Sequence, residues 1–228
     1  MRTGASRDEG GASTGPERTV VREGIRDQLA QLAQMISEWP GLVSGPADQL
    51  IDDSLVLLDH LGDAQTLVDV GSGGGLPGLP LKIARPELAV TLVEADSGKA
   101  AFLVQACARL GLRDVEVVAR RAEVVGHEAR YRESFDVAVA RALAALPVLV
   151  ELCLPLVRIG GRLLAQKTDK EEVGDAGRAI ELLGGTLLSV ARAPSIARMT
   201  GTVVVISKVR TTPSTYPRRP GTPARKPL

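Results

Sequence analysis

Residues 67–96 read LVDVGSGGGLPGLPLKIARPELAVTLVEAD, and this stretch gives the clearest indication of the fold class. An apolar run ends in a cluster of glycines, a helical stretch follows, and a second apolar run ends in acids. Glycines between a strand and a helix let the backbone approach a bound ligand and adopt positive φ angles. The stretch therefore predicts a strand–helix–strand unit of a parallel sheet whose ligand lies at the carboxyl ends of the strands.

The spacing of the glycines and acids indicates the class of ligand. Gly71, Gly73 and Gly75 follow the pattern GxGxG, whereas a dinucleotide-binding turn has GxGxxG. Asp69 precedes the first glycine by two places, and an acid there suits a cationic sulfonium or amino group better than a pyrophosphate. Glu94 ends the second strand, where it can accept hydrogen bonds from both hydroxyls of a ribose. These features favour S-adenosylmethionine over NAD, with a tight turn that holds no ligand as the alternative.

Apolar runs and helical stretches continue to alternate along the chain. We predict strands at residues 66–70, 90–94, 115–118, 135–140, 162–166, 186–191 and 202–208, and helices near 77–84, 98–110, 146–157 and 170–183. Single helices between strands imply a parallel sheet with right-handed crossovers. The last two strands are too close in sequence for a helical crossover, so we expect them to be antiparallel. The fold class is α/β, with a Rossmann-like sheet of seven strands.

Four segments follow from the composition along the chain. Residues 1–17 hold glycine, serine, threonine and charged residues with little to bury, so we expect disorder there. Residues 18–62 form a helical N-terminal unit, with amphipathic helices at 19–37 and 47–61. Residues 63–210 form the main α/β domain, and residues 211–228 form a basic, proline-rich tail.

Overall composition excludes several classes of protein. The chain has 228 residues, 44% of them hydrophobic, and a formal net charge of +1, so any basic surface must be local. It has neither a long apolar run nor the apolar core of a signal peptide, and we expect a cytoplasmic protein that does not contact membranes. Cys107 and Cys153 have no CxxC or histidine spacing, which indicates buried thiols and no metal site.

The C-terminal tail carries a local basic charge. From residue 210 onward it has no acid and five prolines, so we expect an extended segment that lies along RNA phosphates. A solvated tail without a ligand is the alternative. The predicted RNA-binding residues are Arg218, Arg219, Arg225 and Lys226.

Five stretches, in order, resemble the bacterial 16S ribosomal RNA guanine-N7 methyltransferases, the glucose-inhibited division protein B family. They are DVGSGGGLPGLPLKIARPEL at 69–88, RAE at 121–123, ARALA at 140–144, LLAQK at 163–167 and TPSTYPRRPGTPARKPL at 212–228. The resemblance covers residues 47–228. It implies a fold of S-adenosylmethionine-dependent methyltransferases and methyl transfer to N7 of a guanine in the 16S RNA of the small subunit.

The resemblance also implies roles for particular residues. Donor-binding residues by this resemblance are Gly71, Gly73, Leu76, Glu94, Ala122, Glu123 and Arg141. Arg141 and Lys167, at the ends of the fourth and fifth strands, are the catalytic candidates that would hold guanine O6 or a phosphate. Guanine N7 has a lone pair and no proton, so the reaction needs alignment and no general base. His60 and His127 therefore need no catalytic role.

The chain departs from this family in segments expected to face the substrate. It lacks an Asn-Leu-Thr loop, has Leu50 in place of a histidine, and has Gly201 and Thr202 where an arginine is usual. Arg198 is the nearest substitute. The target nucleotide, the effect of these changes on activity, and the choice between naked RNA and a 30S subunit stay open. A small-molecule methyltransferase and a non-catalytic ribosome-assembly factor are the alternatives, and we expect a monomer.

Overall fold

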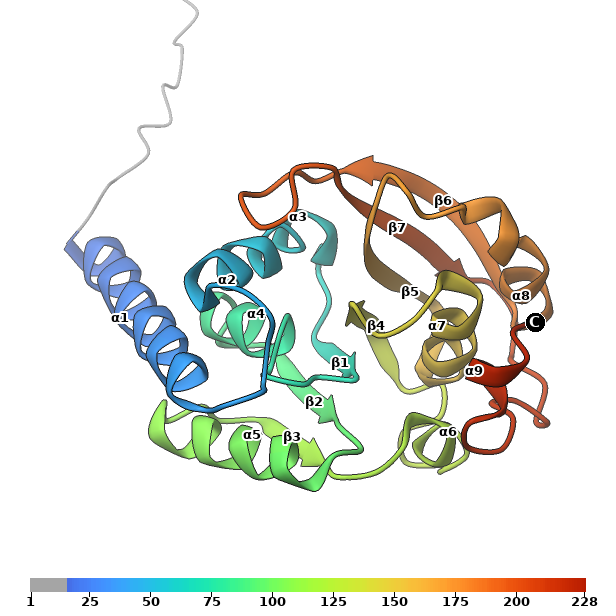
Figure 1. Ribbon diagram of the computed structural model, residues 1–228, viewed down its shortest axis with the longest axis horizontal. Helices are drawn as coiled ribbons and strands as arrows, with labels where there is room; N and C mark the ends of the chain where they lie inside the picture. The colour runs from blue at the N-terminus through green and yellow to red at the C-terminus, as the bar shows by residue number, and fades with distance from the viewer. Residues whose placement is uncertain (1–15) are drawn as a thin grey trace, which may run out of the picture.

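A seven-stranded sheet lies at the centre of the protein, which we describe from a computed structural model of residues 16–228 (Figure 1). The strand order is β3-β2-β1-β4-β5-β7-β6; β1 to β5 are parallel, and β7 is antiparallel to both of its neighbours. The strands are β1 (Thr66–Val70), β2 (Ala89–Val93), β3 (Val115–Val118), β4 (Phe135–Arg141), β5 (Val157–Thr168), β6 (Gly185–Arg192) and β7 (Gly201–Lys208). All seven predicted strands, and the antiparallel final pair, are confirmed.

Helices cover both faces of this sheet. One layer consists of α1 (Pro16–Glu38), α2 (Ala47–Leu55), α3 (Leu58–Leu61), α4 (Gly78–Ala84) and α5 (Ser97–Arg109). The other consists of α6 (Ala122–Val125), α7 (Leu146–Cys153) and α8 (Gly177–Leu182). Strand residues alternate between the two cores, as the twofold repeat of a strand requires: Leu67 joins the first and Val68 the second.

Several helix boundaries differ from the prediction. The helix predicted over 47–61 is broken at residues 56–57 into α2 and α3. The one predicted over 146–157 ends at Cys153 and continues as a 3-10 turn, so β5 begins five residues earlier than expected. The region predicted as a helix over 170–183 contains a 3-10 turn, Val173–Ala176, before α8, and glycines at 174 and 177 account for the weak start.

The N-terminal helices share the core of the main domain. Leu32 and Ile36 of α1, and Ile51 of α2, are buried in the same cluster as Leu79 of α4. The predicted disorder of residues 1–17 concerns a segment that lies almost wholly outside the described residues. No helix in the described part of the chain is long and apolar enough to cross a membrane.

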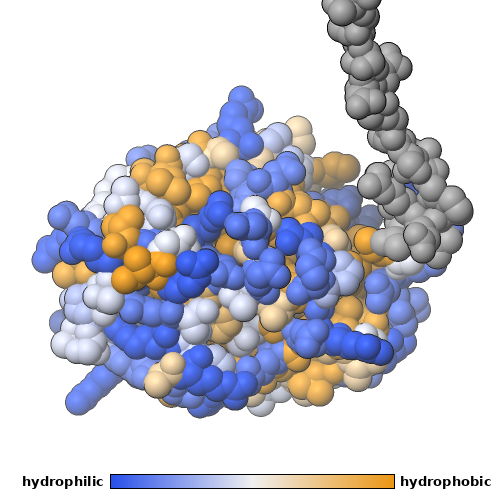
Figure 2. All heavy atoms as spheres, turned by 180° about the vertical axis from the view of Figure 1, so that it is seen from behind, coloured by the Kyte–Doolittle hydropathy of each residue, from blue (hydrophilic) through white to orange (hydrophobic). Residues whose placement is uncertain are grey.

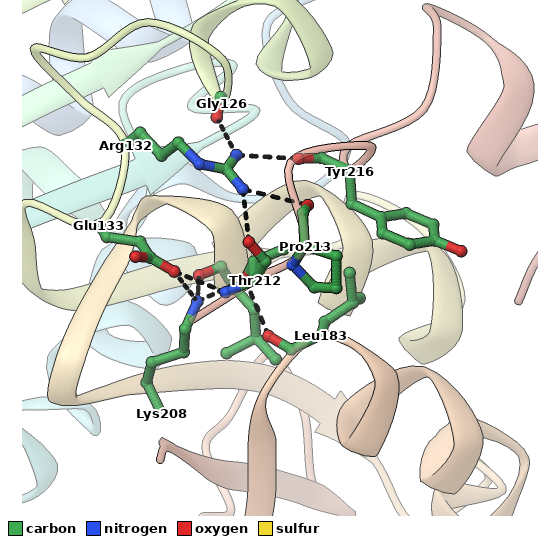
Figure 3. Close-up of polar contacts among 9 residues, drawn as sticks. Gly126, Arg132, Glu133, Leu183, Lys208, Thr212, Pro213 and Tyr216 are labelled. Atoms are coloured by element: carbon green, nitrogen blue, oxygen red, sulfur yellow. Dashed lines mark hydrogen bonds and ion pairs between the residues drawn. The ribbon is translucent and has the colours of Figure 1, made fainter. Parts of the chain in front are cut away.

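The C-terminal tail, predicted as an extended segment, packs against the domain, and its contact with RNA phosphates stays a prediction. Figure 3 shows how Arg132 holds it: the guanidinium donates to the carbonyls of Gly126 (2.7 Å), Tyr216 (2.8 Å), Thr212 (2.8 Å) and Pro213 (3.2 Å). The tail ends in the short helix α9 (Thr222–Arg225), which lies beside α7 in Figure 1. Arg132 donates to main-chain carbonyls of the tail, so the side-chain composition of the tail gives no sign of this contact.

A buried lysine supports the same contact. Lys208, at the end of β7, is fully buried and donates to the carbonyl of Leu154 and to the hydroxyl of Thr212, with Glu133 at 3.1 Å. Burial lowers the pKa of Lys208 to about 8, although Glu133 opposes this.

The surface seen from behind is mainly hydrophilic with scattered hydrophobic side chains (Figure 2), and the edge strand β6 is mostly exposed.

Candidate active site

Two cavities open at the carboxyl ends of the parallel strands and meet at the glycine loop, residues 71–75. The smaller cavity, of about 300 Å³, lies over the ends of β1 and β2, with Glu94 and Ala122 in its wall. The larger cavity, of about 610 Å³, lies between this loop, α2 and the β6–β7 loop. Gly71 and Gly73 line both cavities, so two ligands bound in them would meet there.

Positive φ angles, close contacts and a backbone hydrogen bond fix the conformation of the glycine loop. Gly71 has a φ of 74°, and an added Cβ would lie 2.4 Å from Leu143 Cδ1; at Gly75, with a φ of 82°, it would lie 2.3 Å from Leu79 Cδ1. The Gly71 amide donates to the carbonyl of Val93 at 2.8 Å, which ties the loop to β2. A larger residue at 71 would displace Leu143 in the wall of the smaller cavity, and one at 75 would press on Leu79 in the core.

Glu94 presents its carboxylate at the floor of the smaller cavity. One oxygen accepts from the Gly73 amide and the other from the Asp96 amide, each at 2.8 Å, and the residue is 9% exposed. Each oxygen keeps a lone pair, so the carboxylate can accept from two ribose hydroxyls. This arrangement fits the adenosyl half of S-adenosylmethionine.

Asp69, at the end of β1, lines neither cavity. It is fully buried, one carboxylate oxygen accepts from the Gly78 amide at 2.9 Å, and the other has no partner. It shares the strand side of Leu67, which faces the α4 layer. Burial raises the pKa of Asp69 to about 7. The direct contact of Asp69 with the donor stays a prediction.

Ala122 and Glu123, the first residues of α6, border the smaller cavity as expected. The Glu123 carboxylate accepts from Arg121 at 2.9 Å and from the amide of Gly221, in the tail, at 2.9 Å. Burial alone would raise the pKa of Glu123, but these hydrogen bonds lower it below its ordinary value. The tail therefore reaches back to the wall of the smaller cavity.

A buried acid organises the larger cavity. Asp53 of α2 accepts from Ser195 Oγ at 2.6 Å and from Arg198 Nε at 3.1 Å, and Arg141 Nη1 lies 3.9 Å away. Arg141, at the end of β4, and Arg198 both line the cavity. Burial lowers the pKa of Arg141, although Asp53 and then Asp69 raise it. Arg198 thus lies in the wall of the larger cavity. Its role as the substitute for the arginine usual in the family stays a prediction.

Lys167 also lines the larger cavity, but its ammonium group is already engaged. It donates to the carbonyl of Ala144 and forms an ion pair with Glu171 at 3.1 Å. Leu76 lines this cavity too. The prediction missed Gln166 and Glu171 as cavity residues, although Gln166 lies within the LLAQK stretch and Glu171 follows Lys167 by four residues.

The basic residues of the tail line neither cavity. Arg218 forms a bidentate pair with the fully buried Glu151 of α7, at 2.6 and 2.9 Å, and is not free to bind a phosphate. Arg219, Arg225 and Lys226 are exposed. His127 Nε2 donates to the carbonyl of Pro217 at 2.7 Å, which is a structural contact. Among the described residues no cluster of three or more His, Cys, Asp or Glu is placed to hold a metal ion.

Known structures share this fold. The O-methyltransferase TomG from Streptomyces achromogenes, in complex with S-adenosylmethionine, has a TM-score of 0.56 at 18% identity, over 86% of this chain and 100% of that one. A ribosomal protein L11 methylase from Lactobacillus delbrueckii subsp. bulgaricus has a TM-score of 0.55 at 18% identity, over 75% and 83% of the two chains. At these identities the likeness concerns the fold alone, and it confirms the predicted fold class.

Sequence relatives define the family. Ribosomal RNA small subunit methyltransferase G of Roseiflexus castenholzii is 51% identical over 179 residues, 77% of this chain and 76% of that protein. The protein of the same name from Acetivibrio thermocellus is 37% identical over 215 residues, 89% and 88% of the two chains. A family model described as rRNA small subunit methyltransferase G matches residues 45–198. The chain therefore belongs to the rRNA small subunit methyltransferase G family.

Proposed function

We propose that this protein transfers the methyl group of S-adenosylmethionine to N7 of a guanine in the 16S RNA of the small ribosomal subunit. The observation that carries the proposal is the junction of two cavities at Gly71 and Gly73. One cavity ends in a carboxylate suited to a ribose, and the other holds two arginines around a buried aspartate. A methyl donor in the smaller cavity and a target base in the larger one would therefore meet at the glycine loop.

The residues of the chain act by binding and alignment. S-adenosylmethionine supplies an electrophilic methyl group, and guanine N7 supplies a lone pair without a proton to remove. Glu94 and the residues at the start of α6 hold the adenosyl half in the smaller cavity. Arg141 and Arg198, fixed by Asp53, present donors to a base in the larger cavity. Alignment of this kind lowers barriers by roughly 7–11 kcal/mol.

Further properties belong to the same proposal. A monomer as the active form is part of this proposal. A ribosomal RNA substrate places the reaction in the cytoplasm, where small subunits are assembled. No feature of the site favours a small-molecule acceptor or a non-catalytic assembly role over RNA methylation.

Methyl transfer from a tritiated donor tests the proposal. Undermethylated 30S subunits and naked 16S RNA are incubated with the protein, and the RNA is digested and examined for 7-methylguanosine by mass spectrometry. We expect label in 7-methylguanosine in at least one of the two substrates. Glu94→Ala should abolish it by weakening donor binding, whereas Glu87→Ala, which removes an exposed acid, should not. A wild-type protein that binds the donor but labels neither substrate would refute the proposal.

A further inference from the structure

Unsatisfied polar atoms gather in the larger cavity. In the part of the chain that the structure describes, two residues that line this cavity have a buried polar atom without a hydrogen-bond partner: Arg141 Nε and Gln166 Oε1. Arg198 Nη2, in contrast, lies 3.1 Å from Asp53 Oδ1. Buried polar groups in folded proteins are nearly always hydrogen-bonded, so such a group needs an explanation. Two in one cavity wall indicate that a polar ligand completes them.

The orientation of Gln166 identifies which of its atoms is free. Its Nε2 donates to the main-chain carbonyl of Asp53 at 2.6 Å, and the residue is 2% exposed. A flipped carboxamide would place two acceptors against each other, so the nitrogen stays on Asp53 and the oxygen stays without a partner. Gln166 therefore gives the cavity a neutral acceptor of fixed orientation, beside the cationic donors of Arg141 and Arg198.

An acceptor beside strong donors matches the Watson–Crick edge of guanine. Guanine has an acceptor, O6, next to two donors, the N1–H and the 2-amino group, whereas adenine has an amino donor in place of O6 and an acceptor at N1. The proposed reaction requires N7 to face the junction with the smaller cavity. The 2-amino group, at the far end of the purine, then faces the wall that only the larger cavity has, and Gln166 lies in that wall.

We propose that Gln166 Oε1 accepts a hydrogen bond from the 2-amino group of the target guanine, while an arginine of the cavity donates to O6. Gln166 is then a specificity-determining residue of the methyl transfer. This inference rests on the proposed function and adds to it the recognition of the base. It also gives a role to a side chain that the catalytic candidates Arg141 and Lys167 do not explain.

Inosine at the methylated position tests this contact, because inosine lacks only the 2-amino group. We would reconstitute 30S subunits with guanosine or a single inosine at the nucleotide that the wild-type protein methylates, and measure kcat/KM for both. The wild type should prefer guanosine about tenfold, since inosine leaves the buried oxygen without a partner. Gln166→Met should lower kcat/KM for guanosine about tenfold and bring the two substrates within about twofold of each other.

Controls separate recognition from folding. Gln105→Met makes the same change on an exposed face of α5 and should behave as the wild type. Partial unfolding lowers both rates alike and leaves their ratio unchanged. An unchanged guanosine-to-inosine ratio in Gln166→Met, or no preference in the wild type, would overturn this inference and leave the proposed function intact. A wild type inactive on guanosine in both 30S subunits and naked 16S RNA would instead refute the proposed function.

Discussion

Gly71 shows how one residue shapes the donor-binding end of the sheet. Its positive φ and the nearby Leu143 leave no room for a side chain, and Leu143 itself lines the smaller cavity. We expect Gly71→Ala to push Leu143 into that cavity and to weaken binding of S-adenosylhomocysteine by about tenfold or more, measured by calorimetry. Gly174→Ala, where an added Cβ meets nothing within 4 Å, is the matched control. Equal affinity for the two variants would contradict the expected displacement.

Asp136 gives the protein a pH-dependent contribution to stability. Its carboxylate accepts from Arg158, from the amides of Gln65 and Thr66, and from the Thr66 hydroxyl. Burial raises its pKa, but these hydrogen bonds outweigh burial and lower the pKa from 3.8 to about 2. Because the folded-state pKa is depressed, the stabilisation is present above about pH 4 and is lost as the pH falls through about 2.

Asp136→Asn should therefore lower the free energy of unfolding by about 1–2 kcal/mol at pH 7. The difference from the wild type should shrink as the pH falls from 4 towards 2, because the wild-type carboxyl becomes protonated. Urea unfolding at a series of pH values measures both. A difference that stays constant between pH 7 and pH 2.5 would show that the charge of Asp136 has no part in it.

The site residues differ in how far the sequence could predict them. The positions of Gly71, Gly73 and Glu94 could be predicted from local sequence, because residues that follow parallel strands lie together at the carboxyl end of the sheet. The direction of Asp69 depends on which helix layer its side of β1 faces. Asp53 and Gln166 meet across more than a hundred residues, and only the folded chain brings them together.

Among the elements, the tail depends most on contacts with distant residues. Arg218 pairs with Glu151, which is fully buried on α7, so removing the arginine leaves a buried charge without a partner. We expect Arg218→Met to lower the free energy of unfolding by about 3 kcal/mol, and the double variant Glu151→Met with Arg218→Met to recover most of it. Urea unfolding provides the measurement. Arg219→Met, at the exposed neighbour, should cost less than about 0.5 kcal/mol.

The docking of the tail and the short helices α6 and α9 could not be predicted from the sequence. The tail contains no acid, so its composition resembles that of a free basic segment, yet its partners Glu123 and Glu151 lie far back in the chain. Helices α6 and α9 have four residues each, too few to show a periodic apolar pattern. The strands were predictable because each contains a short apolar run between breaks.

For the whole molecule, RNA binding must depend on local charge, because the net charge is only +1. Docking of the tail changes how its basic residues can contribute. Arg218 is neutralised by Glu151, which leaves Arg219, Arg225 and Lys226 exposed on one short segment. Deleting the tail would also remove the partners of Arg132 and Glu123, so a deletion would mix folding with RNA binding. Charge substitutions on the intact chain avoid this difficulty.

Changing Arg219, Arg225 and Lys226 together to glutamine should weaken RNA binding and flatten its salt dependence. If each side chain contacts one phosphate of a single strand, the slope of log K against log salt concentration should fall by about two units. A triple variant at Arg26, Arg109 and Arg178, which lie exposed on three different helices, changes the net charge equally and should keep the wild-type slope. Filter binding to 16S RNA over a range of salt concentrations measures all three proteins. A tail variant with the wild-type slope would mean that the docked tail only supports the smaller cavity, and that phosphates are bound elsewhere on the surface.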